Sequence, residues 1–183
     1  MLSHEVLWFI LITGFVLARL GEIRLHRINY GFLDAMGVEE LIPQLMRWYY
    51  RLPFLFLPIA VAEHYLWDTR HSVAHIIIGV TMVLVGTLLR LWAMKSLGRT
   101  WSMRCVAFPG IVRIRIGPYR VFAHPEYLSR SVEGMGLFIF GSAFGATLLF
   151  GVFSVLLALR VGSVEKRQLA EYGREFSTVK SAS

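Results

Sequence analysis

Long apolar runs, separated by short clusters of charged residues, dominate this sequence. Three of them approach or reach the roughly 20 residues that a helix needs to cross a bilayer, and we expect helices near residues 2–20, 52–67 and 73–95. The second run is interrupted by two prolines and by Glu63 and His64. Ionisable groups inside a membrane are functional candidates by default, but the sequence assigns no role to these two.

The longest uncharged stretch extends from Gly134 to Leu159. A single helix of that length, at 1.5 Å of rise per residue, exceeds the ~30 Å thickness of a hydrocarbon core. Two interpretations follow from this length: one strongly tilted helix, or two helices that turn in the glycine-bearing stretch 141–145. The second interpretation predicts helices near 126–141 and 145–160.

The distribution of positive charge favours the two-helix interpretation. The chain contains 19 Lys and Arg. With five crossings, all of them except Arg70 and the intramembrane Arg90 lie on one side, which the positive-inside tendency identifies as the cytoplasm. Four crossings would move the cationic tail to the other side. We therefore predict an all-α integral membrane protein, a single domain over residues 1–183, with about five transmembrane helices, a cytoplasmic carboxyl terminus and a cytoplasmic tail helix near 161–176.

Composition excludes several other classes of protein. The chain is 56% apolar and 17% charged, with a mean hydropathy of +0.57, whereas soluble domains carry about 25% charged residues. The net charge of +7 fits contact with anionic lipid headgroups, so we expect a lipid bilayer and no nucleic acid as partner. The single cysteine, Cys105, permits no internal disulfide, and His71 and His75 have no carboxylate in the same turn, so we expect no metal site.

Polar residues that can carry chemistry gather in the predicted cytoplasmic connector, residues 96–127. Gly117-Pro118 predicts a turn, and Pro125 suits the first position of a new helix. The amides of the three residues after Pro125 would then be unpaired at the positive end of a helix dipole, where they attract a carboxylate or phosphate. In the alternative interpretation, His124 only caps the helix and Tyr127 is an interfacial aromatic.

One carboxylate lies on the apolar face of the predicted tail helix. Steps of four, three and four residues place on this face Glu165, Leu169, Tyr172 and Phe176. A buried glutamate usually has a partner, because burying an unpaired carboxylate is costly. The five-helix topology brings Glu165 to the same membrane side as His124 and Tyr127. In the alternative interpretation, the tail is an amphipathic helix that lies on the headgroups, with Glu165 at its margin.

The order of these motifs resembles that of the isoprenylcysteine carboxyl methyltransferase family of integral membrane enzymes. The resemblance covers roughly residues 80–176 and rests on GPYR at 117–120, HPEY at 124–127, a long apolar hairpin, Arg160 and EKRQL at 165–169. A finer similarity links the segment 97–104, together with Arg19, Glu22 and Asn29, to the bacterial branch associated with methylating alkylpyrone-type polyketide lipids. That similarity implies a bacterial inner membrane location.

The resemblance implies an enzyme that uses S-adenosylmethionine in a cytoplasmic pocket formed by the 96–127 connector and the C-terminal helix. The acceptor would be a lipophilic small molecule or a prenylated carboxylate that enters from the bilayer. The residue chemistry agrees, because aromatic rings and a carboxylate suit the sulfonium cation and arginine suits an acidic acceptor. The expected cofactor-binding residues are Tyr119, Arg120, His124, Pro125, Tyr127 and Glu165. The expected catalytic residues are Arg160, Glu165 and Arg104.

Three positions depart from the family pattern. Ala123 stands where the family often has arginine, Ser129 replaces a glycine, and Lys166 replaces the second glutamate of a pair. The altered Ala123 and Lys166 keep open a non-enzymatic sensor or assembly protein. A nicotinamide-dependent membrane reductase related to the steroid 5α-reductases also stays open, because such reductases can show a similar terminal arrangement of short cytoplasmic motifs. Within the methyltransferases, the acceptor stays open between an isoprenylcysteine, an alkylpyrone and a phospholipid.

Overall fold

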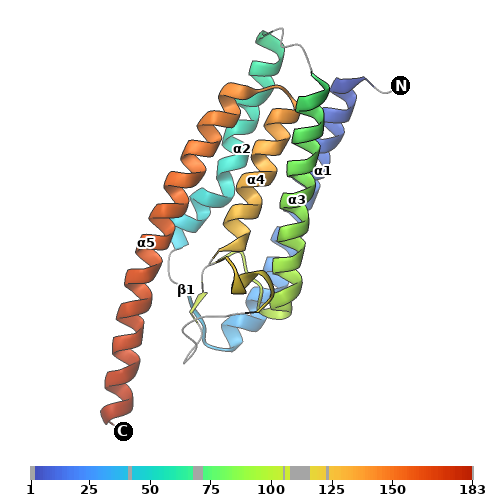
Figure 1. Cartoon of the computed structure of the whole chain (residues 1–183). Coiled ribbons are helices and arrows are strands. Elements are labelled where there is room, and N and C mark those ends of the chain that lie inside the picture. Colours follow the sequence, from blue (N-terminus) through green and yellow to red (C-terminus); the bar gives the residue numbers. More distant parts are fainter. Residues whose placement is uncertain are drawn as a thin grey trace.

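A computed structural model describes residues 3–40, 43–67, 72–104, 106–107, 116–122 and 124–182. Within these residues the chain forms a bundle of long helices: α1 (His4–Ala35), α2 (Pro43–Leu66), α3 (Val73–Leu97), α4 (Pro125–Phe140) and α5 (Phe144–Ala182) (Figure 1). The connections contain two short 3-10 turns, η1 (Gly98–Thr100) and η2 (Gly117–Arg120), and the two-residue strands β1 (Glu39–Glu40) and β2 (Val106–Ala107). The strands pair antiparallel, with Glu39 opposite Ala107.

Of the helices in the described part of the chain, three are long and apolar enough to cross a membrane. These spans are His4–Ala35, Val73–Thr100 and Phe144–Gln168. The all-helical fold class is thereby confirmed, and the spans support a membrane protein. α2 contains two prolines, and α4 has only 16 residues, or about 24 Å, which is shorter than a ~30 Å hydrocarbon core. The number of crossings stays a prediction.

Three helices extend beyond the bounds that the apolar runs predict, and α2 does so by beginning at Pro43, ahead of the predicted start at residue 52. α1 continues past residue 20 to Ala35, and α5 runs unbroken from Phe144 to Ala182, so the segment 161–176 is part of α5 and not a separate tail helix. Hydropathy cannot detect these extensions, because a helix that has formed continues into polar sequence by adding one hydrogen bond per residue. The turn between α4 and α5 falls at residues 141–143.

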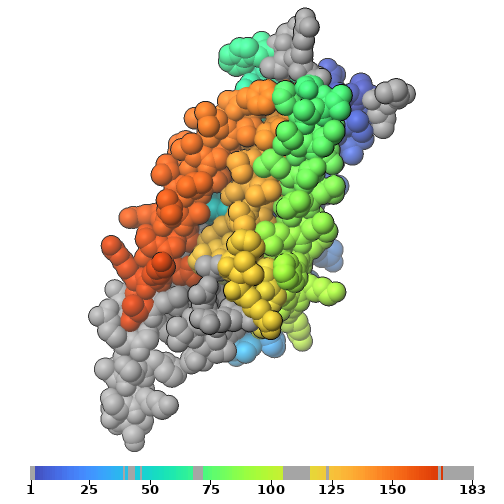
Figure 2. Space-filling model, viewed as in Figure 1, coloured from blue at the N-terminus to red at the C-terminus, as the bar shows by residue number. Residues whose placement is uncertain are grey.

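α3 and α4 pack backbone against backbone. A Cβ atom added to Gly79 or Gly86 of α3, or to Gly136 of α4, would lie 2.7 Å from an atom of the other helix. Small residues of this kind allow membrane helices to approach closely. Figure 2 shows α4 between α3 and α5 on one face of the molecule. The contact fixes the rotation of α4 and with it the direction of its polar residues.

The bundle is closed at the turn between α4 and α5, which we call the hairpin end. Trp8 donates from Nε1 to the carbonyl of Leu137 at 3.0 Å, and His64 Nδ1 lies 2.7 Å from the carbonyl oxygen of Gly141. The carboxylate of Glu63 accepts hydrogen bonds from the first amides of α5, at 2.7 and 2.8 Å. It therefore caps that helix, where a negative charge is favourable. The apolar core at this end includes Trp8, Phe56, Phe138, Phe140 and Phe150.

Candidate functional site

Three of the predicted site residues meet where α4 begins and α5 passes. His124 Nε2 lies 3.1 Å from Glu165 Oε2, and the imidazole stacks on the ring of Tyr127 with centroids 4.9 Å apart. The side chains of His124 and Glu165 are 33% and 15% exposed, so the contact is sheltered but still reachable from solvent. We call His124, Tyr127 and Glu165 the His124–Glu165 cluster. Its role in binding a ligand stays a prediction.

α2 supplies an aromatic wall to this cluster that the sequence analysis missed. Tyr49 donates from its hydroxyl to the carbonyl of Tyr127 at 2.6 Å, and the two rings lie 4.7 Å apart. Together with Val161 of α5 they form a small buried core. The run Trp48-Tyr49-Tyr50 at the start of an apolar segment was the available signal, but such a run is also typical of the membrane interface.

The hydroxyl of Tyr119 is hydrogen-bonded to the neighbouring carboxylate of Glu126. Glu126 is buried and accepts hydrogen bonds from the indole of Trp101 and, at 3.1 Å, from the hydroxyl of Tyr119. Burial, reinforced by the negative charge of Glu126, raises the pKa of the Tyr119 phenol well above its usual range. Tyr119 is therefore a neutral donor whose hydroxyl is engaged with Glu126.

The backbone at the start of α4 corrects one expectation. Pro125 occupies the first position of the helix and is buried, but the amides of Tyr127 and Leu128 donate to the carbonyl of His124 at 3.2 and 3.4 Å. They are therefore paired, because the residue before the helix already turns its carbonyl toward them. Arg120, at the end of η2, is exposed and is the cation that this segment offers to an anion. Ala123 lies outside the described residues.

The two arginines predicted to be catalytic lie outside the His124–Glu165 cluster. Arg104 pairs with Glu40 at 2.6 Å, and its guanidinium lies 4.4 Å from the ring centroid of Tyr30. Arg160 is exposed on α5, whereas its neighbour Val161 is buried. Five residues correspond to about 140° around a helix, so Arg160 and Glu165 point in different directions. Of the three predicted catalytic residues, Glu165 is the one in contact with His124.

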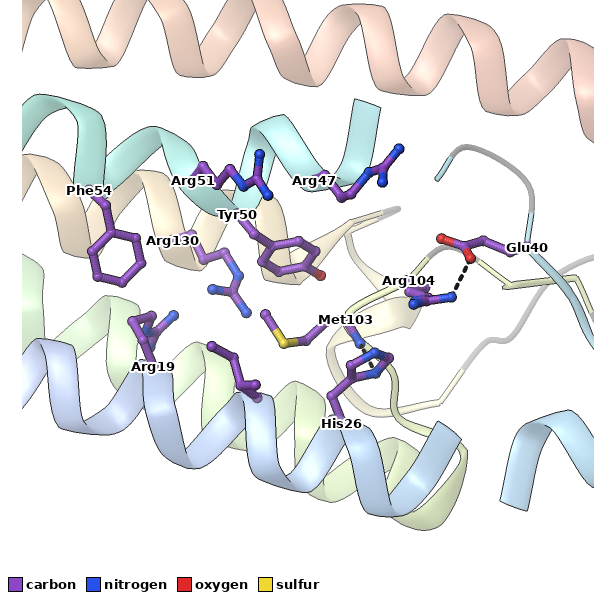
Figure 3. Close-up of a pocket in the computed structure, with 11 residues that line it drawn as sticks. Arg19, His26, Glu40, Arg47, Tyr50, Arg51, Phe54, Met103, Arg104 and Arg130 are labelled. Atoms are coloured by element: carbon purple, nitrogen blue, oxygen red, sulfur yellow. Dashed lines mark hydrogen bonds and ion pairs between the residues drawn. The ribbon is translucent and has the colours of Figure 1, made fainter. Parts of the chain in front are cut away.

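A cavity of about 440 Å³ lies between α1 and α2, with α4 behind it. Figure 3 shows side chains from α2 on one side of this cavity and from α1 on the other, with Arg130 of α4 between them. We call it the arginine cavity, because its lining includes Arg19, Arg47, Arg51, Arg104 and Arg130. Glu40 is the carboxylate in the lining, and the apolar part comes from Ile23, Tyr50, Phe54 and Met103.

Behind the cavity, three arginines and two glutamates form a buried ion network that joins α1, α3 and α4. Glu22 forms ion pairs with Arg19, Arg90 and Arg130, each at 2.7 Å, and accepts a hydrogen bond from Arg130. Glu133 accepts from Arg19 at 3.3 Å, from Arg90 and from the hydroxyl of Thr87. All five charged side chains are at most 4% exposed. Nothing in the sequence links Arg19, Glu22 and Arg90 to Arg130 and Glu133, which lie on a helix distant in the chain.

Comparisons with known proteins find a family and a relative for this chain. Residues 77–171 match the sequence model of the isoprenylcysteine carboxyl methyltransferase family. The uncharacterized protein YpbQ of Bacillus subtilis (strain 168) is 27% identical over 172 residues, which cover 91% of this chain and 98% of that protein. No solved structure matches the chain. The matched family segment contains the His124–Glu165 cluster and Arg104, whereas α1 and α2 lie outside it.

Proposed function

Because the chain belongs to the isoprenylcysteine carboxyl methyltransferase family, whose members are methyltransferases, we propose that it is a membrane O-methyltransferase that uses S-adenosylmethionine. Its acceptor is the carboxylate or acidic hydroxyl of a lipophilic molecule. The observation that carries the proposal is the contact of His124 with Glu165 and Tyr127. It joins at one point two motifs that lie on different helices and that both fall inside the matched segment.

The residues of the His124–Glu165 cluster suit this cofactor. When bound, S-adenosylmethionine supplies an electrophilic methyl group on a sulfonium cation. A cation of this kind is attracted to the face of an aromatic ring such as that of Tyr127 and to a carboxylate such as that of Glu165. The exposed guanidinium of Arg120 is a partner for the cofactor's own carboxylate.

The chain's part in methyl transfer is alignment and exclusion of water. Transfer to oxygen requires the acceptor atom to be held in line at about 3–3.5 Å from the methyl carbon. An ionised carboxylate acceptor needs no base, whereas an acidic hydroxyl must first lose its proton. His124 and Glu165 are the titratable pair that supports such a proton transfer, since they are in contact and only partly exposed.

The proposed orientation places five helices across the membrane and the His124–Glu165 cluster at the cytoplasmic face. The charge distribution supports it, and so does the turn at residues 141–143, which lets α4 and α5 run antiparallel. A reporter fused after Ser183 should behave as cytoplasmic. A reporter that is active only outside the cytoplasm would overturn this topology.

Binding measurements on the detergent-solubilised protein separate this proposal from its competitors. We expect S-adenosylhomocysteine to bind and NADPH not to bind. The variants His124→Ala and Glu165→Ala should each bind S-adenosylhomocysteine at least tenfold more weakly, or about 1.4 kcal/mol. Arg167→Gln, two residues from Glu165 and exposed, is the matched control. Preferential binding of NADPH would indicate a reductase, and binding of neither ligand would indicate a non-enzymatic protein.

The acceptor class is tested with paired long-chain and short-chain substrates. We expect an isoprenylcysteine or an alkylpyrone with a long tail to be methylated more efficiently than its short, soluble analogue. Each methylene buried beside the helices contributes up to ~0.8 kcal/mol, and less when the tail comes from lipid instead of water. Equal turnover of the short and long forms would contradict access from the bilayer, and the preferred headgroup identifies the branch.

A further inference from the structure

The lining of the arginine cavity carries positive charge that the surrounding carboxylates do not neutralise. Arg104 is paired with Glu40. Arg47 and Arg51 are exposed on α2 and have no carboxylate partner among the described residues. Like charges around one cavity repel each other, and the repulsion is stronger where the walls exclude water. An anion inside the cavity would remove this repulsion.

Two arginines in the wall also hold donors that lack acceptors. Nε and Nη1 of Arg19 and Nε of Arg130 are buried without a hydrogen-bond partner in the part of the chain that the structure describes. Both side chains are only 4% exposed, so water does not readily satisfy these donors. Buried donors are normally paired, and unpaired ones destabilise a structure. A guanidinium group can donate two hydrogen bonds to one oxyanion, and Arg19 and Arg130 both line the cavity.

The apolar part of the lining indicates that the anion carries a hydrocarbon tail. Ile23, Phe54 and Met103 line the same cavity as the five arginines. Phe54 is 37% exposed on α2, so it offers apolar surface to a ligand in the cavity. A small hydrophilic anion would leave this side uncovered, whereas an amphiphile would cover it while its headgroup meets the arginines.

The arginine cavity and the His124–Glu165 cluster share a wall. Tyr50 lines the cavity, with the guanidinium of Arg130 over its ring at 4.3 Å from the centroid. Its neighbour Tyr49 contacts Tyr127 of the cluster. A headgroup in the cavity therefore lies next to the tyrosines that border the proposed cofactor position.

From these observations we propose that the arginine cavity binds the acidic headgroup of the lipophilic acceptor, an inference that rests on the proposed methyltransferase function. The headgroup is a carboxylate, a phosphate or an ionised hydroxyl. Arg47 and Arg51 hold it at the rim, Arg19 and Arg130 at the base, and the tail leaves past Phe54. Arg19, Arg47 and Arg51 come from α1 and α2, which lie outside the matched family segment, whereas Arg130 of α4 lies inside it.

A second cavity of about 320 Å³ does not offer the same chemistry. It lies between α1, α3 and α4, and its charged lining consists of one arginine and one glutamate, Arg90 and Glu133, which pair with each other. Its remaining lining is apolar apart from Thr87. It therefore has no excess of positive charge with which to select an anion.

The test measures retention of radiolabelled dodecyl phosphate by immobilised full-length protein in dodecyl maltoside. The double variant Arg47→Gln/Arg51→Gln should bind dodecyl phosphate at least tenfold more weakly, with S-adenosylhomocysteine affinity within twofold of wild type. The matched control is Arg24→Gln/Arg27→Gln, which removes the same charge from exposed positions of α1 outside the cavity lining. The control should bind both ligands as wild type does.

Each outcome of this experiment supports or overturns the proposal. Equal retention by wild type and the Arg47/Arg51 variant overturns it, and so does equal weakening by the control variant, because the effect is then general to surface charge. Competition by inorganic phosphate as strong as that by dodecyl phosphate overturns the part played by the tail. If wild-type protein does not bind S-adenosylhomocysteine, the proposed function fails. Retention of dodecyl phosphate is measured separately, so the two failures can be distinguished.

Discussion

At the hairpin end of the bundle, Glu63 and Trp8 bond to the backbone, whereas at the opposite end charged side chains bond to one another. Glu63 accepts from two amides of α5, and Trp8 donates to a carbonyl of α4. At the opposite end, which we call the cavity end, the ion network, the arginine cavity and the His124–Glu165 cluster are built from side chains. The same residue types thus serve the fold at one end and stay available to ligands at the other.

We expect the largest loss of stability when the ion network at the cavity end is broken. Glu22→Ala removes the carboxylate that Arg19, Arg90 and Arg130 share at 2.7 Å, and it leaves buried cations with less compensation. We expect the free energy of unfolding in mixed micelles to fall by about 3–5 kcal/mol. Glu5→Ala, an exposed position of the same helix, should change it by less than about 1 kcal/mol. Equal effects of the two substitutions would mean that the network does not stabilise the fold.

A smaller effect is expected where α3 and α4 touch. Gly86→Ala places a methyl group 2.7 Å from the carbonyl oxygen of Ser129, so the helices must separate, at a cost of about 1–3 kcal/mol. Gly21→Ala has no atom within 4 Å of the new methyl group and should be neutral or stabilising by up to about 1 kcal/mol. Unfolding midpoints of the two variants measure the difference. Stability of Gly86→Ala equal to that of Gly21→Ala would contradict the close approach.

Two glutamates provide the most direct comparison of the ends. Glu63→Ala leaves two amides of α5 without their acceptor and should lower stability by about 1–2 kcal/mol, with S-adenosylhomocysteine affinity unchanged. Glu165→Ala should weaken S-adenosylhomocysteine binding and leave stability unchanged, since Glu165 contacts the imidazole of His124 beside the site. Thermal unfolding and ligand titration give a midpoint temperature and an S-adenosylhomocysteine affinity for each variant. Loss of binding in Glu63→Ala with intact stability would remove the distinction between the ends.

The sequence predicts much of the fold because membrane helices leave a strong local signal. Apolar runs indicate the long helices, and the glycine-bearing stretch with its flanking charge indicates the turn at residues 141–143. The extensions of α1 and α5 escape prediction, since polar sequence after an apolar run says nothing about where the helix ends. The pairing of the amides after Pro125 with the His124 carbonyl also escapes it, because it depends on the local turn of the backbone.

Only the part of the candidate site that lies in recognisable motifs can be predicted from the sequence. His124, Tyr127 and Glu165 belong to short motifs whose resemblance implies proximity, and the structure brings them into contact. Glu133 and Arg130 join Glu22 only because glycine contacts set the rotation of α4 against α3. The ion network joins three helices that are distant in sequence. The pattern of residues within one helix therefore cannot predict it.

The smallest expected effect concerns the hydroxyl of Tyr49. Tyr49→Phe keeps the ring against Tyr127 and removes one hydrogen bond to the Tyr127 carbonyl, which still accepts from Ser131 at 2.9 Å. We expect stability to fall by about 0.5–1.5 kcal/mol and S-adenosylhomocysteine affinity to stay within about threefold of wild type.

The control for this variant is Tyr50→Phe, on the same helical turn, for whose hydroxyl no hydrogen bond is found among the described residues. It should leave stability within about 0.5 kcal/mol of wild type. If Tyr49→Phe instead weakens S-adenosylhomocysteine binding more than tenfold at unchanged stability, the Tyr49 hydroxyl contacts the ligand itself. The aromatic wall of α2 would then be part of the cofactor site and not only its support, and the boundary between the arginine cavity and the His124–Glu165 cluster would move to Tyr50.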